Sequence, residues 1–286
     1  MSDNTEKQIT QNVLDSIAQT PDPRLKTVMT SLIRHLHAFV SEVELTEEEW
    51  MKGIQFLTRT GQMCDDKRQE FILLSDTLGV SMLVDAINHR LSGEATESTV
   101  FGPFYREGAE EVPLGANISK DGLGEPTVVM GRVLSLDGTP IPHALLDVWE
   151  TNVNGLYEQQ DPEQPEMNLR GKFHADNEGR YWFVGIKPVS YSIPDDGTVG
   201  RMLRSLNRHP FRPAHIHMIV SAEGFAPVTT HLFVKGDKYL DSDAVFGTKD
   251  SLVIDFVRHD SREEAARYNI TTPFYTAEYT FVLKPD

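Results

Sequence analysis

The chain has 286 residues, of which 39% are apolar, and it carries 27 Lys and Arg against 43 Asp and Glu. This length suits one large domain or two modest ones, and the mixed composition excludes wholesale disorder. The net charge of −16 argues against nucleic acid as a partner, because nucleic acid is bound chiefly through cationic contacts to phosphate. No apolar run approaches the ~20 residues of a membrane helix, and the first residues lack the pattern of a signal peptide. We therefore expect a soluble, cytoplasmic protein.

Residues 1 to about 100 have the pattern of helices. Asp22 and Pro23 suit an N-cap and a first helical residue, and apolar residues recur after them at helical spacing. The segment 46–49 forms a capping box that opens a second helix. A further helical stretch follows Asp66 and includes residues 78–87. The sequence thus predicts a small helical bundle that packs on another part of the chain.

Beyond Gly102 and Pro103 the chain becomes rich in β-forming residues separated by turns, with one short helix predicted over 198–207. The predicted strands are 127–136, 143–150, 171–175, 180–188, 214–222, 228–236, 251–259 and 275–285. Their spacing is typical of an antiparallel sandwich. We expect an α+β fold in which an N-terminal helical segment packs on an antiparallel β-sandwich. The predicted domains are 1–108, helical, and 109–286, which carries the chemistry.

Two histidines are spaced to meet on one face of a strand. Side chains two residues apart on a strand point the same way, so His215 and His217 in AHIHMIV converge. Such a pair is found in zinc, copper, nickel and iron sites, although two ordinary buried histidines would fit the same pattern. Because Cys64 is the only cysteine, a thiolate metal cage and an intramolecular disulfide are both excluded.

Two tyrosines supply the hard ligands that such a site needs. Tyr157 follows a glycine-containing loop and Tyr191 precedes an irregular segment, where either could equally be a packing residue. Phenolate oxygen suits ferric iron, and the charge of a bound metal can ionise a phenol whose usual pKa is ~10.

The order of these residues resembles that of the intradiol ring-cleavage dioxygenases. The segments that carry the resemblance are DVWETNVNGLY, YSIPDDGTVG and RPAHIH, and it extends from about Glu97 to Arg258. Within that family, ESTVFGPF and TTHLFVKGDKYLDSDAVFG are most similar to the hydroxyquinol 1,2-dioxygenases.

The resemblance implies one ferric ion per chain, held by Tyr157, Tyr191, His215 and His217. It also implies that Tyr191 leaves the metal and takes a proton while Tyr157 stays, and that Arg212 stabilises developing negative charge in the substrate pocket. The pocket wall implied beside Arg212 is Leu73, Asp76, Val100, Phe101, Gly102, Pro103, Phe104, Ile193 and Pro194. His231 stands where the catechol-cleaving branch carries glutamine, and the sequence leaves its role open.

The implied reaction inserts both atoms of O₂ into hydroxyquinol (benzene-1,2,4-triol), giving 3-hydroxy-cis,cis-muconate, which tautomerises to maleylacetate. Asp76 is the only ionisable residue of the wall apart from Arg212, so we expect it to meet the additional hydroxyl, from a partly hydrated position near the pocket mouth. The resemblance further implies a homodimer formed through the N-terminal helices, with a phospholipid at that interface in some members.

Three other functions fit parts of the sequence. A catechol or chlorocatechol 1,2-dioxygenase would use the same metal and a different pocket. A zinc hydrolase would use His215 and His217 but would give no role to both tyrosines. A noncatalytic β-sandwich binding module would leave the histidines structural. The colour of a tyrosinate–iron centre distinguishes the dioxygenases from the last two.

Overall fold

The computed structural model describes residues 2–65, 68–90 and 94–286. Asp66, after which the sequence predicts a helix, lies outside them. The chain forms two compact units, Met1–Gln62 and Met63–Asp286. The second unit thus includes helices that precede the predicted change in character near residue 108, and the division into domains 1–108 and 109–286 stays a prediction.

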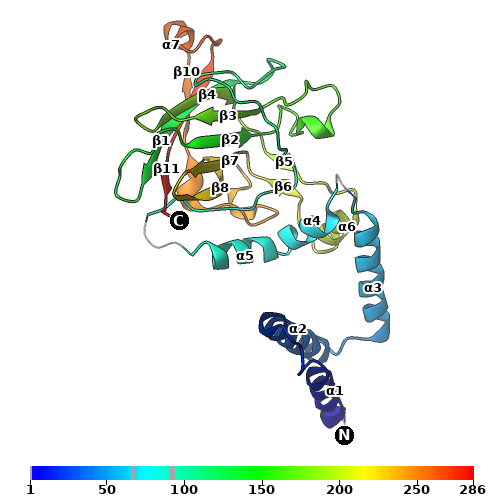
Figure 1. The fold of residues 1–286 in the computed structure, drawn as a ribbon. Helices are drawn as coiled ribbons and strands as arrows, with labels where there is room; N and C mark the ends of the chain where they lie inside the picture. Colours follow the sequence, from blue (N-terminus) through cyan, green and yellow to red (C-terminus); the bar gives the residue numbers. More distant parts are fainter. Residues whose placement is uncertain (1, 66–67, 91–93) are drawn as a thin grey trace. The chain divides into compact units, whose positions relative to one another are not determined.

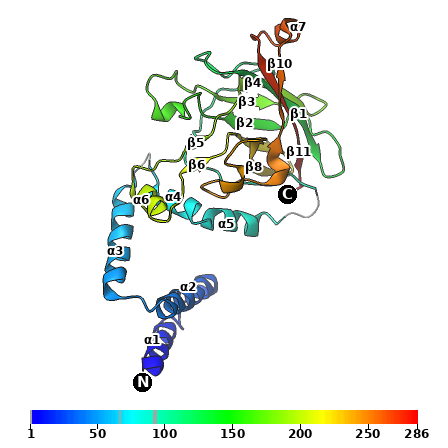
Figure 2. The same ribbon diagram turned by 180° about the vertical axis from the view of Figure 1, so that it is seen from behind.

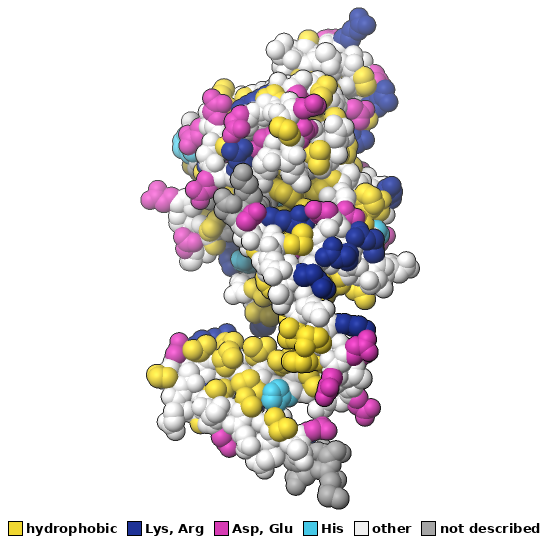
Figure 3. Space-filling model, turned by 90° about the vertical axis from the view of Figure 1, so that its right-hand side faces the viewer, with side chains coloured by type: hydrophobic (Ala, Val, Ile, Leu, Met, Phe, Trp, Pro, Cys, Tyr) yellow, Lys and Arg dark blue, Asp and Glu magenta, His cyan; other side chains and the backbone are white. Residues whose placement is uncertain are grey.

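The first unit consists of three helices, α1 (Ser2–Ser16), α2 (Pro23–Glu42) and α3 (Glu47–Gln62). The predicted N-terminal signals are confirmed: the Asp22 carboxylate accepts the N–H groups of Arg24 and Leu25. Thr46 and Glu49 exchange the hydrogen bonds of a capping box. No described residue of α2 is buried, and apolar side chains gather over the helices of this unit (Figure 3).

Among its described residues, the second unit contains two large sheets and four α-helices, α4 (Glu70–Thr77), α5 (Val80–Asn88), α6 (Thr198–Ser205) and α7 (Arg262–Ala266) (Figures 1 and 2). One sheet has the order β10–β11–β1–β4, with β1 at Pro126–Ser135, β4 at Arg180–Ile186, β10 at Phe256–His259 and β11 at Phe274–Leu283. The other has the order β3–β2–β7–β8–β9, with β2 at Leu145–Trp149, β3 at Arg170–His174, β7 at His215–Ala222, β8 at Phe225–Val234 and β9 at Val253–Ile254. A short pair joins β5 (Tyr191–Ser192) to β6 (Phe211–Arg212).

The α+β class is confirmed, but the sheets are mixed. The pairs β1–β11 and β8–β9 are parallel, whereas the remaining pairs are antiparallel. The predicted strand 251–259 is in fact two strands. It is divided at Asp255, where the chain leaves β9 in one sheet and enters β10 in the other. Alternation of apolar residues does not reveal which sheet a strand joins.

The core lies between the two sheets. Inward-facing residues from both, including Val133 of β1, Phe173 of β3, Ile216 of β7 and Phe281 of β11, are fully buried in one apolar cluster. None of the helices in the described ranges is both long and apolar enough to cross a membrane. A cytoplasmic location stays a prediction.

One buried carboxyl group joins the sheets. Glu150 follows β2, is 2% exposed, and its Oε1 accepts the N–H of Ile186 in β4 at 3.1 Å. Its Oε2 has no hydrogen-bond partner among the described residues. Burial raises the pKa of Glu150 from 4.5 to about 8, so the group is mainly protonated at neutral pH.

In Glu150→Gln we expect the free energy of unfolding to fall less with rising pH than in the parent. The unfolded chain ionises this group above about pH 4.5, whereas the folded chain keeps it protonated until about pH 8. Parent stability therefore falls through that window, by up to ~1.4 kcal/mol per pH unit. Denaturant unfolding between about pH 5 and pH 8 measures the slope. The exposed Glu223→Gln serves as control, and identical slopes in Glu150→Gln and the parent would contradict the prediction.

Candidate active site

Strand register brings three side chains into one row across the second sheet. His217 of β7 lies opposite Trp149 of β2 on one side and His231 of β8 on the other. Cross-strand neighbours share a face of the sheet. The Trp149 ring accordingly stacks on His217 with ring centroids 4.7 Å apart, and the His231 ring meets it edge-on at 4.1 Å. His217 is held from both sides.

The two histidines and two tyrosines predicted from the sequence converge on one point. His215 Nε2 lies 3.1 Å from His217 Nε2, and Tyr157 Oη lies 2.8 Å from His217 Nε2. Tyr191 Oη lies 3.1 Å from Tyr157 Oη and 3.4 Å from His215 Nε2. All four residues are buried. The cluster therefore offers two imidazole nitrogens and two phenol oxygens to a common centre.

The spacing and ionisation of these donors fit a metal ion. Ligands about 2.0–2.2 Å from one ion, separated by angles of roughly 90–105°, lie about 2.8–3.5 Å apart, which matches the distances between these four residues. His215 Nδ1 donates to Pro213 O at 2.7 Å, which leaves Nε2 with a free lone pair. Burial lowers the pKa of His215 to about 3 and that of His217 well below its usual value, so both rings are neutral.

Tyr157 needs a nearby cation in order to ionise. Burial, followed by the proximity of Tyr191, raises the pKa of Tyr157 well above its usual value. A phenolate in this position therefore requires a strong positive charge nearby, such as a metal ion. The buried cluster can hold a metal, and its donors favour a hard ion.

A glycine allows the two tyrosine segments to approach one another. Gly155 has a φ of +74°, and a Cβ added to it would lie 2.7 Å from the Cβ of Tyr191. An L-residue side chain would be strained in this conformation and would also push Tyr191 away. The loop NVNGLY can therefore bring Tyr157 beside Tyr191 only because it contains this glycine.

Arg212 reaches the same centre from β6, where it pairs with Tyr191 of β5. Its Nη1 lies 3.2 Å from His215 Nε2, and its other nitrogens donate to Asp243 at 3.1 and 3.3 Å. Although burial opposes ionisation of both groups, their attraction raises the pKa of Arg212 and lowers that of Asp243. Arg212 is thus a permanently charged, fixed donor.

The predicted substrate wall includes a segment that lies against the predicted metal ligands. The Phe104 ring stacks on Tyr157 with centroids 4.7 Å apart. Gly102 has a φ of +78°, and a Cβ there would lie 3.1 Å from His217 Cε1, so glycine permits this close approach. Phe101 packs near Trp149, Val100 is buried, and Ile193 is buried two residues after Tyr191.

A cavity of about 170 Å³ opens beside this wall. It is lined by Leu73, Pro103, Phe104 and Pro194, all predicted, together with Arg68, Gln69 and Glu70. Arg68 donates to Glu70 and to Asp196 at 2.8–3.0 Å, and Glu70 accepts the N–H of Val199 near the start of α6. This network ties α4 to α6 at the edge of the cavity.

The expected partial hydration of Asp76 is wrong. The residue is only 4% exposed, because it lies on the buried face of the short helix α4. Burial raises its pKa, while a hydrogen bond from Ser81 and the charge of Arg212 oppose that rise. Asp76 is therefore a buried acceptor within the field of Arg212.

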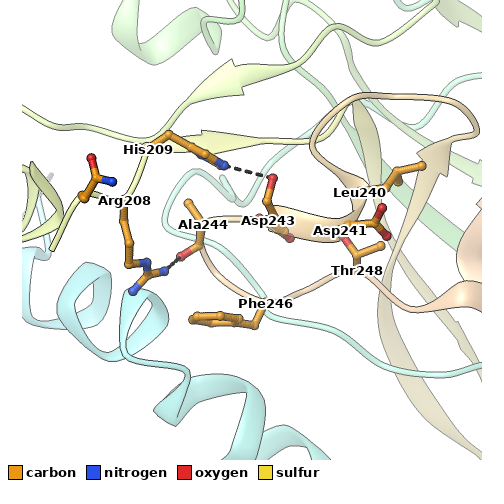
Figure 4. A pocket seen from close by; sticks show the side chains of 10 residues that line it. Arg208, His209, Leu240, Asp241, Asp243, Ala244, Phe246 and Thr248 are labelled. Atoms are coloured by element: carbon orange, nitrogen blue, oxygen red, sulfur yellow. Dashed lines mark hydrogen bonds between the residues drawn. The ribbon is translucent and has the colours of Figure 1, made fainter.

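A larger cavity, about 460 Å³, is lined by residues 207–209, 240–244, 246 and 248 (Figure 4). Arg208 crosses one side of it, donating to Ala244 O at 3.0 Å, with its guanidinium over the Phe246 ring. Asp243 of this lining accepts hydrogen bonds from Arg212. Because none of the predicted wall residues lines this cavity, we do not assign the substrate to it.

Comparison with known proteins identifies the family. Residues 100–285 match the family described as Dioxygenase, and residues 22–96 match the one described as Catechol dioxygenase N terminus. The chain belongs to the intradiol ring-cleavage dioxygenases. A hydroxyquinol 1,2-dioxygenase of Rhizobium sp. is 51% identical, covering 97% of this chain and 95% of the relative.

Two further relatives of this dioxygenase cover nearly the whole chain. A 6-chlorohydroxyquinol 1,2-dioxygenase of Cupriavidus pinatubonensis is 46% identical, and the match covers 100% of this chain and 99% of the relative. The crystal structure of a hydroxyquinol 1,2-dioxygenase from Pseudomonas putida superimposes with a TM-score of 0.94 at 52% identity, covering 99% of this chain and 100% of that one.

Sequence reasoning misses three features that shape the dioxygenase site. Trp149 and His231 flank His217 only through strand register, which the sequence alone does not give. Asp243 lies in a loop among several acidic residues and nothing in its spacing singles it out. The family pattern draws attention to His231 but assigns it no role.

Proposed function

We propose that the protein is a hydroxyquinol 1,2-dioxygenase that uses one ferric ion per chain. The observation that carries the proposal is the buried convergence of two tyrosines and two histidines next to a fixed arginine. Asp76, predicted to belong to the substrate wall, is also buried and interacts electrostatically with that arginine. Membership of the family, with hydroxyquinol 1,2-dioxygenases at about 50% identity over the full chain, supports this substrate. Oxygen uptake with hydroxyquinol, and mass spectrometry of the ring-opened acid, test it.

In this proposal Tyr157, Tyr191, His215 and His217 hold the iron. When bound, ferric iron supplies the positive charge that ionises the phenols and withdraws electron density from a chelated diol. His215 and His217 present neutral Nε2 lone pairs, so no proton has to leave them. The phenol oxygens contact one another and the imidazole nitrogens, so they already face the centre that the metal would occupy.

The chain's own residues then handle protons and charge. Tyr191 Oη takes one proton from the diol as the substrate binds, whereas Tyr157, stacked under Phe104, stays in place. Arg212 Nη1, already directed at His215 Nε2, stabilises negative charge that develops on the substrate. Asp243 keeps the guanidinium in that orientation.

Protein from iron-supplied cells is expected to contain about one ferric ion per chain and to absorb broadly in the visible, because tyrosinate-to-iron charge transfer gives such centres their colour. Elemental analysis and a visible spectrum are the measurements. Stoichiometric zinc without a visible band would favour a zinc hydrolase. A colourless protein that binds no metal would favour a noncatalytic module.

Catechol or chlorocatechol cleavage is the alternative within the family. The buried carboxyl group of Asp76 favours hydroxyquinol, because an acceptor in an apolar wall costs free energy unless a donor such as a third hydroxyl meets it. Parallel kinetics on the three substrates decide between them.

We further propose a homodimer formed through the N-terminal helices. Val28, Leu32, Leu36 and Phe39 of α2, and Val43 just after it, are about half exposed at helical spacing, and they form an apolar face that a partner would cover. Light scattering coupled to size-exclusion chromatography should give twice the mass of the chain, and Leu36→Glu should reduce it. Organic extraction followed by mass spectrometry tests for a phospholipid at that interface.

A further inference from the structure

We propose that His231 is a positioning residue that, together with Thr99, fixes the ring of His217 for metal binding and couples it to the substrate wall. This inference rests on the proposed function and deepens it. It assigns a role to a histidine that lies within the buried cluster but that the ligand set does not include.

Hydrogen bonds connect His217, His231 and Thr99 in a continuous series. His231 Nε2 lies 2.7 Å from His217 Nδ1, and His231 Nδ1 lies 2.9 Å from Thr99 Oγ1. His231 is fully buried, and Thr99 is 3% exposed. The backbone N–H of Thr99 donates to Thr229 O at 2.9 Å, which anchors the end of the series to β8.

The hydrogen bonds of this series can run in either of two directions, and only one of them leaves His217 able to bind a metal. If His217 Nδ1–H donates to His231 Nε2, then His231 Nδ1–H donates to Thr99 Oγ1, and His217 Nε2 keeps a free lone pair. In the reverse direction a proton sits on His217 Nε2 and faces the ligand cluster. Thr99 provides an acceptor for the first arrangement, and a hydrogen bond to the distal nitrogen is how proteins usually fix a ligating imidazole.

His231 is not itself a ligand in this arrangement. One ring nitrogen from each of His215, His217 and His231 lies within 4.8 Å of the other two, so the three could be taken for a metal-binding triad. Both ring nitrogens of His231, however, are already hydrogen-bonded, one to His217 and one to Thr99. Its Nε2 also faces Nδ1 of His217, whereas the ligand cluster meets Nε2 of that ring.

The same series of hydrogen bonds extends to the predicted substrate wall. Thr99 immediately precedes the predicted wall segment 100–104, and a Cβ added to Gly102 of that segment would lie 3.1 Å from His217 Cε1, so the segment passes close to the His217 ring. This segment is thus linked to His217 through Thr99 and His231, and it also passes close to the ring at Gly102. We infer that the same hydrogen bonds that fix the ring also hold the start of this segment in place.

The experiment compares His231→Leu with His231→Gln by ferric-ion affinity, measured in competition with a chelator, and by the visible charge-transfer band. We expect His231→Leu to bind iron roughly 10–100-fold more weakly and to shift the band, because His217 Nδ1 loses its acceptor. His231→Gln should remain within about threefold of the parent by the same principle, since its amide oxygen can accept from His217 Nδ1 and its amide nitrogen can donate to Thr99.

Thr99→Val, with Thr230→Val as its matched control, provides a second test that does not depend on whether His231→Leu folds. Both threonines are buried, but Thr230 Oγ1 donates to Glu97 O and its side chain lies on the other face of β8 from His231. Thr99→Val should weaken iron binding and shift the band, whereas Thr230→Val should change neither.

Two results would overturn the inference. Iron affinity and band unchanged in both His231→Leu and Thr99→Val would remove the positioning role. Iron loss in His231→Gln as severe as in His231→Leu would mean that an imidazole ligand is required there. A parent protein that binds no iron would instead refute the proposed function, so the two failures are distinguishable.

Discussion

Tyr191→Phe is expected to retain bound iron and to lose turnover by about 10²–10⁴-fold. The substitution removes only the phenol oxygen, which lies 3.1 Å from Tyr157 Oη and 3.4 Å from His215 Nε2. Tyr157 and the two histidines remain to hold the metal. The lost oxygen is the proposed acceptor of a substrate proton, and loss of a positioned acid–base group typically costs this much in rate.

The measurements are iron content, the visible spectrum and kcat with hydroxyquinol. Tyr181→Phe is a matched control, because Tyr181 is also buried and its hydroxyl donates to Tyr279 O at 2.8 Å, away from the metal cluster. It should lose about 1 kcal/mol of stability and keep its turnover. Tyr157→Phe should change the visible spectrum in the presence and in the absence of substrate. Parent-like turnover in Tyr191→Phe would show that this oxygen does not accept the proton.

Part of the candidate site can be predicted because the positions of its two histidines obey local rules. The alternation of AHIHMIV is enough to place His215 and His217 on one face of a strand, since side-chain direction along a strand depends only on position within it. The helix caps at Asp22 and Thr46 follow in the same way from neighbouring residues, because capping is a short-range interaction.

The remainder depends on contacts between distant segments. His217 lies between Trp149 and His231 because β2, β7 and β8 are neighbours in a particular register, and alternation within one strand does not specify its neighbours. The parallel pairing of β1 with β11 joins segments far apart in the chain and leaves no local signal. The burial of Asp76 escapes prediction for the same reason, since α4 is only eight residues long and its periodicity is weak.

Hydroxyquinol should be cleaved with a higher kcat/KM than catechol, by about 10²–10³-fold. A site built around a substrate hydroxyl can reject the analogue that lacks it by roughly 10⁴–10⁵. Asp76 is buried, which strengthens the penalty, but Ser81 continues to donate to it when catechol is bound, which limits the penalty. The expected ratio corresponds to about 2.7–4 kcal/mol.

Substitution of Asp76 separates recognition of the third hydroxyl from the shape of the wall. Asp76→Ala should lower kcat/KM for hydroxyquinol by most of that ratio and leave kcat/KM for catechol nearly unchanged. In Asp76→Asn, kcat/KM for hydroxyquinol should lie between the values of the parent and of Asp76→Ala, because the amide oxygen can still accept a hydrogen bond. Leu73→Ala, on the same helix and in the same wall, is the matched control. It removes packing that both rings use, so it should affect both substrates similarly. If Asp76→Ala instead lowers kcat/KM equally for both diols, the carboxyl group has a structural role in the wall and does not bind the third hydroxyl of hydroxyquinol. If the parent cleaves catechol with a kcat/KM equal to or higher than that for hydroxyquinol, the chain acts as a catechol dioxygenase. The proposed iron centre would be unaffected.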